Sequence, residues 1–94
     1  MIKVGYSRQL AYAYTASGAG TTGVNGGYTQ SGTYNSHSYY KNANGYFLFY
    51  STTSGVDWAF AATLGGTTLY HCSTITGTWL KAGGASPVPT VVSG

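Results

Sequence analysis

The chain alternates short runs of aromatic and β-branched residues with clusters of Gly, Asn and Ser. Such a pattern is typical of short strands joined by tight turns. The clusters include Asn25-Gly26-Gly27, Asn44-Gly45 and Gly83-Gly84. No segment shows the 3.6-residue spacing of apolar positions that an amphipathic helix requires. The pattern therefore predicts an all-β fold, namely a small antiparallel β-meander, sandwich or partly open barrel with extended N- and C-terminal arms.

Turn signals divide the chain into seven expected strands: Lys3 to Ala16, Gly27 to Tyr34, Ser38 to Lys41, Tyr46 to Ser51, Asp57 to Ala62, Thr67 to Ser73 and Thr78 to Lys81. The segment "NANG" predicts a hairpin turn, because Asn-Gly accepts positive φ. The prolines of "PVPTVV" cannot donate to a central ladder, so this segment is expected as an edge strand or an extended arm. We therefore divide the chain into an N-terminal strand or arm (1–16), a β-meander core (17–82) and a C-terminal arm (83–94).

The side-chain parity of the central hairpin predicts a sheet with two apolar faces. Tyr46, Leu48 and Tyr50 share one face, and Phe47 and Phe49 share the other. An antiparallel sheet that faces water on one side would instead carry polar residues on that side. Either the sheet folds over into a small barrel, or another chain covers its second face.

Composition removes several classes of function. Charged residues are 5% of the chain, against roughly a quarter in ordinary soluble proteins. The net charge of +3 comes from four cations and one acid, and scattered cations do not form the basic stripe that nucleic acids bind. No apolar run is long enough to span a membrane or to form the core of a signal peptide. We therefore expect synthesis in a cytoplasm and neither nucleic-acid nor membrane partners.

Candidate chemistry is sparse. Asp57 is the only acid, so a pair of catalytic carboxylates is not available. A Ser/His/Asp arrangement could be drawn from Asp57 with His37 or His71, but no G-x-S-x-G turn presents a nucleophile. His71 and Cys72 are adjacent, and neighbours on a strand point to opposite faces, which argues against a shared metal ion. We expect no catalytic residues, no metal site and no cofactor, and a single cysteine permits no internal disulfide.

One resemblance covers most of the chain. "VNGGYTQSGTYN" and "YYKNANGY", followed by Trp58, "LGGTTLYHCS", "TGTW" and a Pro-containing segment, resemble the small β-meander modules of tailed-phage virion proteins and of some extracellular repeat proteins of eukaryotes. In that module a Lys-Pro or Arg-Pro pair usually follows the Asn, and here Ser36-His37 replaces it. The resemblance implies no enzymatic activity.

Our first hypothesis is a non-enzymatic structural protein, a virion accessory subunit of a phage capsid, fibre or tail. It would assemble as a homo-oligomer or on a major coat or tail protein. Tyrosine is enriched at interfaces, and a low charge does not keep copies apart. The residues expected to supply contact area are Tyr12, Tyr14, Tyr39, Tyr40, Phe47, Phe49, Pro87, Val88, Pro89, Val91 and Val92.

The alternative hypothesis is a glycan- or receptor-binding β module. Aromatic rings next to amide groups can bind neutral sugars. The candidates are Tyr34, Asn35, Trp58 and Trp79. In a small β domain, however, aromatic residues also serve as core and as cross-strand pairs.

Overall fold

The computed structural model describes residues 12–94, and it is all-β. One short 3₁₀ helix, η2 (Thr22–Val24), accompanies the strands β1 (Tyr14–Ser17), β2 (Gly26–Tyr34), β3 (His37–Asn42), β4 (Phe47–Ser51), β5 (Asp57–Ala61), β6 (Tyr70–Cys72), β7 (Leu80–Lys81) and β8 (Thr90–Ser93). The part of the first expected strand that precedes residue 12 lies outside the described residues.

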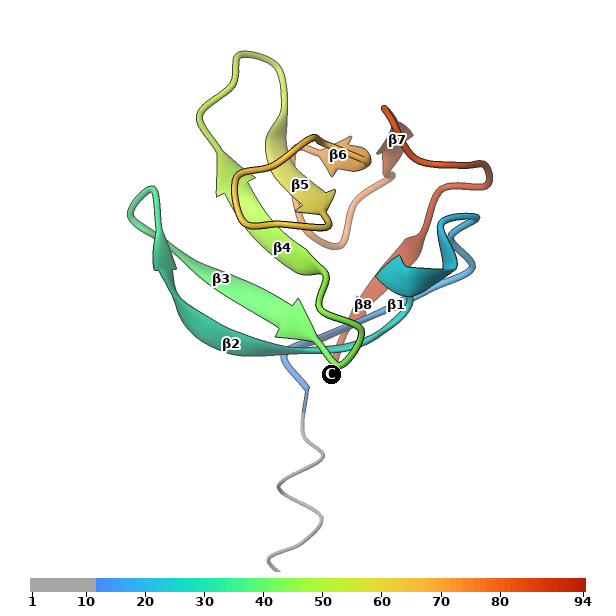
Figure 1. The fold of residues 1–94 in the computed structure, drawn as a ribbon, viewed down its shortest axis with the longest axis horizontal. Helices are drawn as coiled ribbons and strands as arrows, with labels where there is room; N and C mark the ends of the chain where they lie inside the picture. The colour runs from blue at the N-terminus through green and yellow to red at the C-terminus, as the bar shows by residue number, and fades with distance from the viewer. Residues whose placement is uncertain (1–11) are drawn as a thin grey trace, which may run out of the picture.

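The strands form a single antiparallel sheet in the order β7-β6-β5-β4-β3-β2-β1-β8. From β1 to β7 the chain is a meander, in which each strand pairs with the next. The last strand returns to the start, and Thr15 of β1 pairs with Val92 of β8. The sheet curls into a half-barrel with β8 and β7 as its two edges (Figure 1). Of the two alternatives for "PVPTVV", Thr90–Ser93 is therefore an edge strand.

Irregularities in two strands help the sheet to curl. The pairing of β2 with β3 shifts between Gln30 and Gly32, and the pairing of β5 with β6 shifts where Asp57 and Trp58 both face Cys72. Extra residues of this kind bend a strand and increase its twist. Asp57 has a φ of +62° and begins β5, in agreement with its expected place at the start of a strand.

The main core fills the concave face. It gathers side chains from both ends of the sheet, which only the inner face of a curled sheet can bring together. Its largest fully buried side chains are Tyr28, Leu48, Phe60 and Tyr70, together with Val24 of η2. Burying a large apolar side chain contributes on the order of 1.5–3 kcal/mol. Trp79 completes this core, with its ring centroid 4.6 Å from that of Phe60.

A second, smaller cluster lies on the convex face. Phe49, Ala59 and Ala61 are buried there beneath partly exposed neighbours, which are Tyr34, Tyr39, Phe47, Val56 and Leu64. The parity prediction is confirmed, because Leu48 packs in the concave core while Phe47 and Phe49 pack on the other face. Val56 and Leu64 come from loops, so the chain covers part of its second face itself.

Asn42, at the end of β3, is the only buried polar residue among the described residues, with 6% of its surface exposed. Its Nδ2 donates to the carbonyl oxygens of Gly23 at 2.8 Å and Asn25 at 3.2 Å. Its Oδ1 accepts from the backbone amides of Asn44 at 3.1 Å and Tyr46 at 2.8 Å. One carboxamide therefore shapes the β3–β4 turn and ties it to the segment before β2.

Tyr70 ties together the segments that lead out of β1 and into β8. Its hydroxyl accepts a hydrogen bond from the Thr21 amide at 3.0 Å and donates one to the Ala85 carbonyl. The backbones also approach closely, because a Cβ on Gly20 would lie 2.1 Å from the Ser86 oxygen. Tyr70 and Gly20 thus hold the segment after β1 against the segment before β8.

Replacing Asn42 by Ala should lower the free energy of unfolding by about 2–4 kcal/mol, because buried donors and acceptors lose their partners. Urea unfolding followed by circular dichroism measures the change. The control is Asn44→Ala, which removes two exposed hydrogen bonds of 3.2 and 3.4 Å and should cost less than about 1 kcal/mol. An equal loss in both variants would contradict the role of Asn42.

Tyr28 should make the fold sensitive to alkali. Burial, and then the nearby Tyr46, raises the pKa of Tyr28 above its ordinary value. The contribution of Tyr28 to stability is therefore constant below about pH 10 and falls at higher pH, where its hydroxyl ionises first in the unfolded chain, by at most about 1.4 kcal/mol per pH unit.

Urea unfolding of wild type and Tyr28→Phe between pH 8 and pH 11.5 would isolate this contribution. The variant should be less stable at neutral pH, because it loses the 2.6 Å hydrogen bond from Tyr28 to the Val24 carbonyl, but its stability should fall less steeply with pH. Parallel curves for the two proteins would refute the prediction.

Candidate binding pocket and sheet edges

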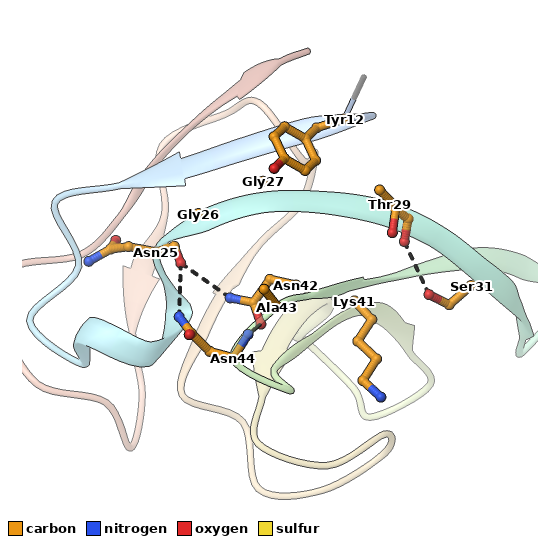
Figure 2. Close-up of a pocket in the computed structure, with 10 residues that line it drawn as sticks. All are labelled: Tyr12, Asn25, Gly26, Gly27, Thr29, Ser31, Lys41, Asn42, Ala43 and Asn44. Carbon is orange, nitrogen blue, oxygen red and sulfur yellow. Dashed lines mark hydrogen bonds between the residues drawn. The ribbon is translucent and has the colours of Figure 1, made fainter. Parts of the chain in front are cut away.

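A hollow of about 430 Å³ opens where the start of β2 meets the β3–β4 turn (Figure 2). The β2 side contributes Asn25 to Gly27, Thr29 and Ser31; the β3 side contributes Lys41 to Asn44; and Tyr12 borders the hollow from the segment before β1. This space exists partly because Gly26 and Gly27 place no side chains in it. Both walls are attached to Asn42, which fixes their separation.

The ring of Tyr12 packs directly against the backbone of Gly27. A Cβ on Gly27 would lie 2.2 Å from the Tyr12 ring, so only glycine lets the ring pack against the β2 backbone. The chain bends before β1, and the Ala13 amide donates to the Tyr28 carbonyl at 2.9 Å. Tyr12 remains 41% exposed. The ring is therefore held in place and still accessible to a ligand.

Among the described residues that line the hollow, all polar side chains except Lys41 are neutral. The Asn25 side chain turns away from the hollow and binds the backbone of Ala19. Its Oδ1 accepts from the Ala19 amide at 2.9 Å, and its Nδ2 donates to the Ala19 carbonyl at 3.2 Å. Asn44 donates to the carbonyl oxygens of Gly23 and Asn25, and the Ser31 hydroxyl donates to the Thr29 carbonyl at 3.2 Å. The Lys41 ammonium lies 5.4 Å from the centroid of the Phe47 ring. The hollow can thus exchange hydrogen bonds but offers no acid–base pair.

The residues expected to form an interface divide between surface and interior. Tyr12, Pro87 and Val92 are exposed, whereas Phe49, Pro89 and Val91 are buried and offer little contact area. Tyr14, Tyr39, Tyr40, Phe47 and Val88 are partly exposed. Tyr14 and Tyr40 pack edge to face on the concave side, with centroids 5.2 Å apart. Burial, and then Tyr14, raises the pKa of Tyr40.

The residues expected to contact glycans do not form one site. Trp79 is 2% exposed in the core, and its Nε1 donates to the Ile75 carbonyl at 2.8 Å, so its ring is not available for stacking. Tyr34 packs edge to face on Phe49 on the convex side. Asn35 is exposed in the β2–β3 turn and donates to the Tyr50 carbonyl at 2.9 Å.

Trp58 belongs to a partly exposed aromatic cluster with His37 and Tyr50. The His37 and Tyr50 ring centroids are 4.1 Å apart, and the Tyr50 and Trp58 centroids are 5.4 Å apart. This cluster offers a second aromatic surface, next to Asn35 and remote in sequence from the hollow at Tyr12.

The histidine and cysteine of β6 point to opposite faces, as expected. Cys72 is buried in the concave core, and its thiol donates to the Thr78 carbonyl at 3.1 Å. His71 is only partly buried. Among residues 12–94, no three His, Cys, Asp or Glu side chains gather in a way that could hold a metal ion. The same residues contain no helix long and apolar enough to cross a membrane.

The two edges of the sheet differ in chemistry. The β7 edge consists of two residues, Leu80 and Lys81, and carries a charge. The β8 edge, "TVVS", is four residues long and uncharged. Val91 points into the core, while Val92 is 54% exposed. Within residues 12–94, no strand pairs with the outer side of β8. Lysines on an edge strand protect it from pairing with another chain, and β8 carries none.

Sequence reasoning did not identify the hollow. The sequence indicates only that Thr29, Asn44 and Gly27 belong to strands and turns. Nothing local indicates that Tyr12 packs against Gly27, fifteen positions later. The one available signal was the repeated Asn-Gly-Tyr order in "NGGY" and "NGY". The structure places these two segments side by side, with Asn42 between them (Figure 2).

The fluorescence of the two tryptophans should be quenched to different extents by acrylamide. In Trp58→Phe the remaining Trp79 should give blue-shifted emission with at least about threefold weaker acrylamide quenching than free tryptophan, because its ring is buried. Wild type should show an additional, accessible component from Trp58. Quenching of the variant as strong as that of free tryptophan would contradict the burial of Trp79.

Comparison of the chain with models of protein families, with curated proteins and with solved structures finds no significant match.

Proposed function

We propose that this protein is a non-enzymatic structural subunit that assembles with copies of itself, or with a coat or tail protein, in a larger particle. The observation that carries the proposal is the uncharged β8 edge, whose outer side pairs with no strand within residues 12–94. An uncharged, β-branched edge strand can add a strand of a neighbouring molecule to its sheet through main-chain hydrogen bonds. The exposed Val92, at 54%, would supply apolar area beside such contacts.

Composition supports the same proposal. Five charged side chains in 94 residues provide little of the electrostatic repulsion that keeps small proteins apart. Partly exposed tyrosines on both faces, such as Tyr14 and Tyr39, offer rigid contact area with a hydroxyl group at one end. Together with the module resemblance, these features favour an accessory position in a phage virion, in a capsid decoration, a fibre or a tail.

Val92→Lys should weaken assembly about tenfold or more, because a lysine on an edge strand opposes pairing and would face a like charge in a symmetric contact. Light scattering over a concentration series measures the mass. The matched control is Ser54→Lys, which adds the same charge in the exposed β4–β5 loop and should assemble like wild type.

Two outcomes would count against the proposal in different ways. Wild-type protein that stays monomeric at every concentration would contradict self-assembly itself. Assembly that survives Val92→Lys unchanged would show that copies meet, but not through the β8 edge.

A further inference from the structure

We propose that the hollow beside Tyr12 is a binding site for a neutral sugar residue. The site does not depend on assembly. It uses different residues from those that the sequence suggests for glycan binding. The fold brings together the ring of Tyr12, the backbone of Gly27 beneath it, the hydroxyl of Thr29 and the carboxamide of Asn44 (Figure 2).

The aromatic ring of Tyr12 offers a surface on which a sugar can stack. Tyr12 lies on Gly27 and is 41% exposed, so the side of the ring away from the backbone is accessible. The face of an aromatic ring carries negative charge density, and the C–H face of a pyranose is weakly positive and apolar. A ring already held on the backbone also loses little conformational freedom when a sugar stacks on it.

Asn44 and Thr29 supply groups that can form hydrogen bonds with a sugar. Asn44 uses its Nδ2 to donate to the carbonyl oxygens of Gly23 and Asn25, which fixes its carboxamide. No hydrogen bond within residues 12–94 uses the Oδ1 of Asn44 or the hydroxyl of Thr29. These groups can therefore pair with sugar hydroxyls, each of which both donates and accepts.

Charge decides between ligand classes. Within residues 12–94, Lys41 is the only charged side chain that lines the hollow, and its ammonium lies near the Phe47 ring. A phosphate or other multiply charged anion is usually held by several cations or converging N–H groups. The lining contains no carboxylate that would select a cation. An apolar ligand would leave the amide and hydroxyl groups without partners, at a cost for each.

Size agrees with this assignment. Sites for small molecules usually span ~300–1,000 Å³, and this hollow measures about 430 Å³. Several residues that line it, among them Tyr12, Thr29 and Asn44, are exposed, so a sugar could be bound while the rest of a glycan chain extends away from the protein.

Saturation-transfer difference NMR on the full-length protein tests the proposal. The spectra are recorded at low temperature, because a 9.8 kDa monomer must tumble slowly for saturation to spread through it. The probes are D-glucose, D-galactose and N-acetyl-D-glucosamine, with D-glucuronic acid as a charged counterpart of glucose. We expect transfer to at least one neutral sugar, so that binding does not require the carboxylate of glucuronic acid. Tyr12→Ala should reduce the signal about fivefold or more.

Tyr39→Ala is the matched control, because Tyr39 also packs over a β2 glycine, Gly32, but does not line the hollow. It should keep the wild-type signal. Gly27→Ala supplies an independent variant, which displaces the Tyr12 ring without removing it and should also lose the signal. Circular dichroism verifies that each variant is folded.

Four results would overturn the proposal: no transfer to any of the neutral sugars, transfer to glucuronic acid only, equal loss in Tyr12→Ala and Tyr39→Ala, or loss in Trp58→Ala with binding retained in Tyr12→Ala. The last would assign binding to the aromatic cluster of His37, Tyr50 and Trp58 instead. None of these results bears on assembly, which light scattering measures separately.

Discussion

The carboxamide of Asn42 is the constraint on which much of this structure depends. It is buried at the end of β3, and most of its hydrogen bonds go to backbone groups of the β3–β4 turn and of the segment before β2, with a further one from its Nδ2 to the Tyr28 hydroxyl at 3.3 Å. Buried backbone groups without partners are costly, so the β3–β4 turn and the segment before β2 are held at one separation. That segment carries Val24 into the concave core, where the Tyr28 hydroxyl donates to its carbonyl. The same separation defines the hollow beside Tyr12.

The strands could be predicted from the sequence because their signals are local. Alternating aromatic residues between Gly and Asn clusters located the strands from β2 to β5 to within about a residue at each end, and parity placed Leu48 and Phe49 on opposite faces. The exposure of individual aromatic residues could not be predicted in this way. Trp79 lies outside any regular strand, and it is buried because a loop turns it onto Phe60 across the curled sheet.

Long-range contacts also escaped prediction. The pairing of β1 with β8 joins residues nearly eighty positions apart, and the sequence left "PVPTVV" open between an edge strand and an arm. β6 is shorter than the expected Thr67 to Ser73, since the carbonyl groups of Thr68 and Leu69 accept hydrogen bonds from Gly83 and Gly84. The hollow arises from three separate segments, so no single stretch of sequence could indicate it.

The two proposals place different demands on the same sheet. Assembly would use the β8 edge, where the chain offers backbone groups and no charge, whereas sugar binding would use side chains held over glycines at the start of β2. A protein could carry out both, with one surface committed to the particle and another facing outward. The aromatic surfaces that remain partly exposed on both faces of the sheet are compatible with such a division.

Sedimentation velocity of the unmodified protein, over a wide range of concentration, tests the central claim most directly. The account predicts a species larger than the 9.8 kDa monomer, with a share that grows as concentration rises. A single 9.8 kDa species at every concentration would contradict assembly from copies of this chain. The β8 edge would then need a different chain as its partner.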